Sequence, residues 1–161
     1  MGRISMIIKL ATVAGPTVFK VVKTFGPQLR ALKDSNPEVF NRLTERVAAL
    51  AKVGKGNPRS AAHIEKRIGV LRDQVTYLYA SANTPAVAAK ASAWRTELDA
   101  IEHGLPVLEA MTPKLRKARL KEIDARVNEL SEVILVATFD DEIEDAEVVD
   151  DEGFESEPKQ D

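Results

Sequence analysis

The side chains that most often carry catalysis are scarce in this chain. Its 161 residues include two histidines and no cysteine. His63 and His103 both stand outside the spacings, such as HExxH, that bring two imidazoles to one metal ion. We interpret both as surface or helix-capping histidines. The absence of cysteine excludes thiolate catalysis, disulfides and cysteine-ligated metal ions.

Other catalytic patterns are also missing from the sequence. It has no glycine-rich phosphate loop between a strand and a helix, and no GxSxG nucleophile motif. The carboxylates of Glu97, Asp99, Glu102 and Glu109 follow one another along a single expected helix, which is typical of a solvated face. We therefore predict that the protein is not an enzyme. We expect no cofactor, no metal ion and no small-molecule substrate.

The distribution of charge is the clearest indication of what the chain binds. Residues 1–33 carry six basic side chains and no acidic one, whereas residues 140–161 carry twelve acidic side chains and one basic one. The net charge of −2 therefore divides into +9 for residues 1–139, with 22 basic and 13 acidic residues, and −11 for the remainder. Such asymmetry bears on binding partners and not on the fold.

On a helical wheel, residues 16–33 have one apolar side and one basic side. A helix of this kind binds a membrane by burying its apolar side and placing lysine and arginine on anionic headgroups. The same pattern is typical of a helix that packs on its own protein or on a second copy of it. The predicted membrane- or partner-binding residues are Lys9, Val18, Lys20, Val22, Lys23, Phe25, Leu29 and Arg30.

The densest basic cluster lies further along the chain. The residues predicted there to bind anions such as phosphate are Lys114, Arg116, Lys117, Arg119 and Lys121. No aromatic residue is interleaved to stack on bases, and no DNA- or RNA-binding motif is present. Nucleic acid is therefore the less favoured partner, and a solvated face paired with nearby acids is the simpler interpretation.

The C-terminal segment is acidic and poor in aromatic residues. This composition predicts a disordered tail over residues 140–161. Val148, Val149 and Phe154 lie among the acids, as they would in an extended partner-binding motif. A tail that only keeps the protein soluble is the simpler interpretation.

Four dipeptides mark the expected helix starts. In each, Asn or Thr can cap free backbone N–H groups, and proline suits the first helical position. Between them the apolar residues recur every three or four positions, which predicts amphipathic helices joined by short turns and therefore antiparallel neighbours. The dipeptides are Asn36-Pro37, Asn57-Pro58, Thr84-Pro85 and Thr112-Pro113.

Glycine and proline also predict where helices break. Breaks are expected at Gly15-Pro16, at Gly26-Pro27 and near His103, where Gly104 and Pro106 follow. The predicted fold is all-α: an antiparallel three-helix bundle preceded by amphipathic helices and followed by the disordered acidic tail. The expected parts are basic amphipathic N-terminal helices with a hinge (1–56), the bundle (57–139) and the tail (140–161).

Together these features predict a non-enzymatic helical scaffold or adaptor. It would lie at the cytoplasmic face of a membrane, or self-associate, through residues 1–33, and it would recruit a protein partner. The alternative is a nucleic-acid-associated regulatory protein that uses the basic cluster of residues 114–121. No run of about 18 apolar residues is present that could span a membrane, so we predict a cytoplasmic location, at the inner membrane face if residues 1–33 bind lipid.

Overall fold

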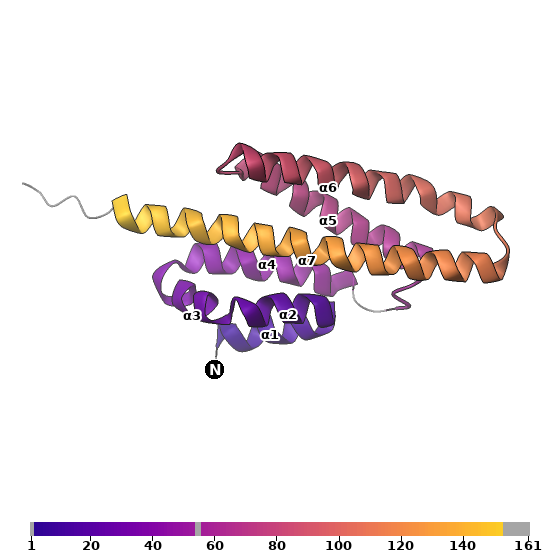
Figure 1. The fold of residues 1–161 in the computed structure, drawn as a ribbon. Helices are drawn as coiled ribbons and strands as arrows, with labels where there is room; N and C mark the ends of the chain where they lie inside the picture. The colour runs from indigo at the N-terminus through magenta and orange to yellow at the C-terminus, as the bar shows by residue number, and fades with distance from the viewer. Residues whose placement is uncertain (1, 54–55, 153–161) are drawn as a thin grey trace, which may run out of the picture.

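The computed structural model describes residues 2–53 and 56–152, except the side chains of Arg3 and of residues 148–152. All regular elements in these ranges are helices, so the prediction of an all-α fold is confirmed. In chain order (Figure 1) they are α1 (Arg3–Ala14), α2 (Pro16–Thr24), α3 (Gly26–Ser35), α4 (Pro37–Val53), α5 (Ala61–Ser81), α6 (Pro85–Gly104), the 3₁₀ helix η1 (Leu105–Ala110) and α7 (Pro113–Glu152).

Three of the four predicted helix starts are confirmed, because α4, α6 and α7 begin at their prolines. The fourth is wrong: α5 begins at Ala61, and its cap is Ser60, whose hydroxyl accepts a hydrogen bond from the backbone N–H of His63 at 3.2 Å. The side chain of Asn57 instead accepts from the N–H of Arg59 at 3.0 Å, within the preceding turn.

The predicted helix breaks are also present. Gly15 alone separates α1 from α2, and its φ of 120° lies in the region that favours glycine. This sharp turn folds α2 back against α1. Phe25 separates α2 from α3, and α6 gives way to η1 after Gly104, next to His103.

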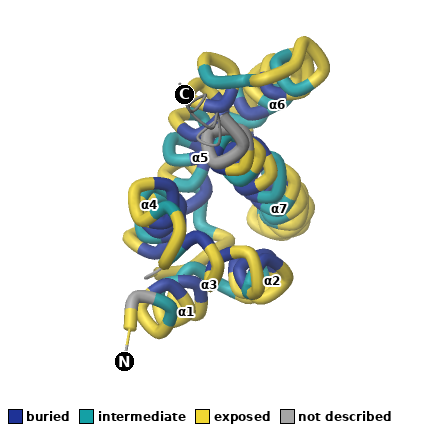
Figure 2. The backbone as a smooth tube through the Cα atoms, turned by 90° about the vertical axis from the view of Figure 1, so that its left-hand side faces the viewer, coloured by how far each residue is buried: buried dark blue, intermediate teal, exposed yellow. Residues whose placement is uncertain are grey.

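The helices α5, α6 and α7 form the predicted bundle, in which α5 packs mainly on α6 and then on α7. Figure 2 shows α6 at one end of the molecule and α1 at the other, with α5 and α4 between them. The long helix α7 contacts α2 and α4 as well as α5 and α6. One continuous apolar core therefore extends from Ile7 in α1 to Ala146 in α7.

The prediction that a disordered tail begins at residue 140 is wrong, because α7 continues to Glu152 without a break. Among the side chains described between positions 141 and 147, those of Asp141, Glu142 and Ala146 are buried. The carboxylates of Asp141 and Glu142 accept hydrogen bonds from residues far away in the sequence. Ala146 belongs to the apolar core. Residues 153–161, including Phe154, lie outside the described part of the chain.

Glu142 is bound by a cation from α4. Its carboxylate lies 3.1 Å from Nε of Arg42, and its side chain is only 4 % exposed. Burial, followed by the charge of Glu142, raises the pKa of Tyr77 above its ordinary value. The guanidinium of Arg46 lies over the Tyr77 ring, 3.9 Å from the ring centroid. This polar group ties α4 and α5 to the C-terminal third of α7.

Asp141 closes the turn between α5 and α6. Its carboxylate accepts hydrogen bonds from the backbone N–H of Asn83 at 3.3 Å and from the hydroxyl of Ser81 at 3.4 Å. The residue is 3 % exposed, and burial raises the pKa of its carboxyl group above the ordinary value of 3.8. The folded protein therefore holds a proton on Asp141 at pH values where the unfolded chain has released it.

This raised pKa predicts a measurable pH dependence. The contribution of Asp141 to the free energy of unfolding should fall as pH rises from about 3.8 through the folded-state pKa, since the folded state binds more protons there. Asp141→Asn keeps an oxygen for Asn83 and an N–H group for Ser81. We expect it to be more stable than the wild type at pH 7, with a smaller advantage at pH 4. Urea denaturation at both values tests this, and an advantage that grows toward pH 4 would contradict it.

Candidate functional site

The apolar half of the predicted binding face lies inside the molecule. Val18, Val22, Phe25 and Leu29 are each no more than 8 % exposed. The turn at Gly15 places α2 between α1 and α7, so this side of the helix meets protein on both flanks. The ring of Phe25 stands edge-on to that of Phe139, with the ring centroids 5.2 Å apart. The structure thus corresponds to the alternative in which these residues pack on the protein's own helices.

The basic half of the predicted face is on the surface. Lys9, Lys23 and Arg30 are exposed. Lys20 is exposed too, and its ammonium group lies 3.0 Å from a carboxylate oxygen of Glu132 in α7. The structure therefore separates the eight predicted residues into a buried apolar set and an exposed basic set.

A different set of apolar side chains accompanies these bases on the surface. Met6, Ile8, Val13 and Phe19 are large hydrophobic residues with exposed fractions between 38 % and 51 %. Isolated exposed apolar residues are common, but a group of them on adjacent helices points to an interaction surface. Ile8 and Phe19 line one groove together with Lys23 and Arg30, and we call these four residues the N-terminal surface.

A shallow groove of about 190 Å³ lies within this surface. Ile4 and Ile8 line it from α1 and Phe19 lines it from α2, so its walls are mostly apolar. Lys23 and Arg30 line the same groove and supply its positive charge. An apolar channel bordered by bases is suited to a partner that is both hydrophobic and anionic.

The predicted anion-binding cluster near the start of α7 is only partly free. The guanidinium of Arg116 donates to the backbone carbonyls of Leu108, Glu109 and Met111 at 2.9 to 3.3 Å, closing the end of η1. Arg119 pairs with Glu122 at 3.0 Å. Lys114, Lys117 and Lys121 are exposed. Figure 1 shows the start of α7 at the far end of the molecule from α3, so the structure does not join this cluster to the N-terminal surface.

The other predicted residues divide between described and undescribed parts. Val148 and Val149 belong to the backbone of α7, but their side chains lie outside the described part of the chain, as does Phe154. The carboxylates expected to form a solvated face are partly engaged. Arg72 of α5 pairs with Asp99 at 2.7 Å and also with Glu102, and Arg126 of α7 pairs with Glu97.

Sequence reasoning missed a buried polar group at the start of α5. His63, which we expected to be a surface or helix-capping histidine, is only 9 % exposed. It shares a helix face with Arg67, four residues later, whose side chain is 12 % exposed. The i, i+4 spacing of His63 and Arg67 was the one signal available in the sequence. The partly buried partners of Arg67 lie about 60 residues further along the chain.

Within residues 2–53 and 56–152, no helix is both long and apolar enough to cross a membrane. The same residues contain no group of three or more His, Asp or Glu side chains positioned to hold a metal ion. Comparisons with known protein families, with curated proteins and with solved structures find no match to this chain.

Proposed function

We propose that this protein is a non-enzymatic helical scaffold that binds anionic membranes through its N-terminal surface. One observation carries the proposal: the exposed apolar residues Ile8 and Phe19 line one groove with the basic residues Lys23 and Arg30, within a segment, residues 1–33, that contains no acid. Among the described side chains of this segment, Lys20 forms an ion pair, with Glu132 of α7. Lysine and arginine near an anionic membrane contribute roughly 1 kcal/mol each.

The proposed binding leaves the core of the protein intact. Ile8 and Phe19 are already outside, so they can enter the headgroup region without unfolding α1 or α2. Their burial adds to the electrostatic attraction at about 25 cal/mol per Å² of apolar surface. Binding by a few side chains is reversible and weakens as salt screens the charges. Anionic lipids face the cytoplasm, which is why the proposal includes the inner membrane face.

The proposed scaffold would present the rest of the helical bundle to a protein partner. The exposed side chains of Tyr79 and Val107, with exposed fractions of 58 % and 60 %, lie on α5 and η1, which are separate from the N-terminal surface. These are the places on the described surface where such a partner should first be sought by crosslinking.

Vesicle co-sedimentation tests the membrane proposal. We expect the wild type to pellet with vesicles of phosphatidylcholine and phosphatidylserine, and much less with phosphatidylcholine alone. The double variant Ile8→Ser/Phe19→Ser should bind at least about tenfold more weakly, because tenfold corresponds to only 1.4 kcal/mol. The two residues are 40 % and 38 % exposed, so the variant should remain folded, which urea denaturation checks.

The matched control is Tyr79→Ser/Val133→Ser, which removes comparably exposed apolar side chains from α5 and α7. The proposal would be contradicted if vesicle binding fell equally in the two double variants, or if the wild type did not sediment with anionic vesicles. Analytical ultracentrifugation examines the alternative of self-association. A dimer that dissociates in Ile8→Ser/Phe19→Ser but persists in the control would assign the N-terminal surface to contact between two copies of the chain.

A further inference from the structure

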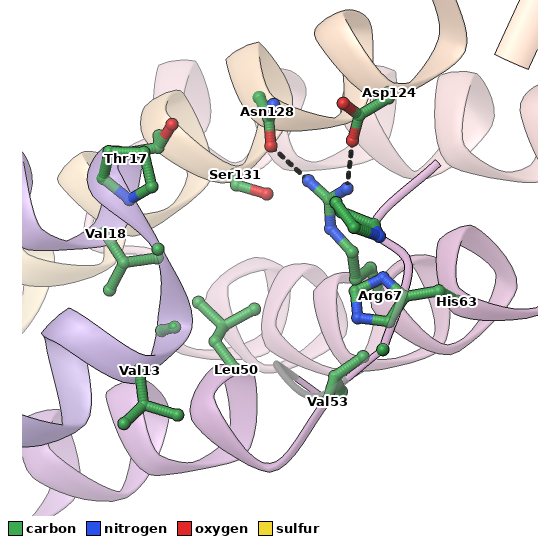
Figure 3. A pocket seen from close by; sticks show the side chains of 15 residues that line it. Val13, Thr17, Val18, Leu50, Val53, His63, Arg67, Asp124, Asn128 and Ser131 are labelled. Carbon is green, nitrogen blue, oxygen red and sulfur yellow. Dashed lines mark hydrogen bonds and ion pairs between the residues drawn. The ribbon is translucent and has the colours of Figure 1, made fainter. Parts of the chain in front are cut away.

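A cavity of about 330 Å³ lies where the turn between α1 and α2 meets α4, α5 and α7. Its volume falls within the range of small-molecule sites. Figure 3 shows Val13, Val18 and Leu50 on one side, and His63 and Arg67 on the other. The cavity therefore has one apolar wall and one polar wall.

His63 is the unexplained group in this cavity. Its side chain lines the space and the residue is 9 % exposed, yet neither Nδ1 nor Nε2 has a hydrogen-bond partner among the described residues. A neutral imidazole carries one donor and one acceptor, and the protonated form carries two donors. Leaving such atoms buried and unpaired is costly, and in native proteins it usually means that a water or ligand is bound.

Arg67 is held beside His63 in a fixed position. Its Nη1 donates to Oδ1 of Asp124 at 2.6 Å, and its Nη2 donates to the side-chain oxygen of Asn128. The amide nitrogen of Asn128 is left as a donor beside the cavity. Asp124 also lies 3.8 Å from Nε of Arg59. Two guanidinium groups thus share one carboxylate, although Arg59, whose side chain is 54 % exposed, does not itself line the cavity.

The start of α2 brings further donors to the same space. Thr17 and Val18 occupy its first turn and line the cavity, and the Gly15 N-cap provides no side-chain hydrogen bond. The first backbone N–H groups of a helix lack partners within the helix, and they form the positive end of its dipole. Helix starts of this kind bind anions.

We infer that this cavity binds a small organic anion with a short apolar body. Its carboxylate or phosphate group would lie between the first turn of α2 and the side chains of His63 and Arg67. The apolar part would contact Val13, Leu50 and neighbouring residues. The cavity and the groove that contains Ile8 and Phe19 share no lining residue, so the inference does not depend on the proposed function.

The two histidines allow a direct test by NMR. The Cε1–H resonance of His63 reports on the cavity, and that of the exposed His103 serves as an internal control. Titration with butyl phosphate and butanoate should shift the His63 signal saturably and leave the His103 signal unchanged. Inorganic phosphate, which lacks the apolar body, should bind at least about tenfold more weakly than butyl phosphate. If neither histidine resonance shifts during the titrations, or if both shift equally, the inference is overturned and the cavity is filled by water.

Two substitutions extend the test by calorimetry with butyl phosphate. His63→Phe keeps a ring of similar shape but removes both unpaired nitrogens, so binding should fall at least tenfold while the thermal midpoint rises. Ala14→Leu places extra volume in the cavity without removing any hydrogen bond, and should also abolish binding. His103→Gln is the control and should bind as the wild type does. Undiminished binding by Ala14→Leu would overturn the inference even if His63→Phe fails to fold.

Discussion

The Phe139→Ala variant should lose about 3–5 kcal/mol of unfolding free energy, the range for deleting a large buried aromatic side chain. Phe139 is 0 % exposed and meets the edge of the Phe25 ring, with 5.2 Å between ring centroids. The cavity left behind would lie at the contact between the N-terminal helices and α7, which has little freedom to collapse. Urea denaturation followed by circular dichroism measures the loss.

Two further variants make this prediction specific. Tyr79→Ala truncates an aromatic residue that is 58 % exposed, and its effect should stay within about 0.5 kcal/mol. A double-mutant cycle with Phe25→Ala should yield a coupling energy of about 0.5–1.5 kcal/mol for the ring pair. A loss below about 1 kcal/mol in Phe139→Ala would contradict the packing described for α7.

The second large effect is expected for Arg67→Met. The side chains of Arg67 and Asp124 are 12 % and 13 % exposed, and their atoms lie 2.6 Å apart. Removing one partner of a fully buried ion pair leaves the other charge uncompensated, which costs about 3–5 kcal/mol, and the pair here is partly buried. We expect a loss toward the lower end, because Arg59 remains 3.8 Å from the same carboxylate.

The double variant Arg67→Met/Asp124→Asn separates charge from packing. It removes the isolated carboxylate and should recover much of the stability lost in Arg67→Met. Arg126→Met is the comparison, because the side chain of Arg126 is 48 % exposed. Its loss of unfolding free energy should be clearly smaller than that of Arg67→Met. If the double variant is no more stable than Arg67→Met, the contribution of Arg67 comes from its packing and not from its charge.

The features of the fold that could be predicted are those that depend on residues close together in the sequence, namely helix starts and helix breaks. Proline at the first helical position determined three helix starts, and Gly15 marked the sharp turn after α1. The start of α5 was misplaced because Asn57 and Ser60 are both good caps. Only the folded chain shows that Ser60 accepts from the N–H of His63.

Long-range contacts explain the other errors. Asp141 and Glu142 resemble residues of a solvated acidic tail, yet their partners are Ser81, Asn83 and Arg42, which lie 58 to 100 residues earlier in the chain. The cavity beside His63 is built from helices α1, α2, α4, α5 and α7, and no local spacing predicts such convergence. The amphipathic pattern of residues 16–33 predicted that one face would be covered, but not what would cover it.

The position of α7 in the chain has a consequence for biosynthesis. Ribosomes make α1 to α6 first, so the sides of α2 and α5 that contact α7 emerge before that helix does. At roughly 5–20 residues per second, the 40 residues of α7 take about 2–8 s to translate. During that interval the sides of α2 and α5 that α7 later covers remain exposed to solvent.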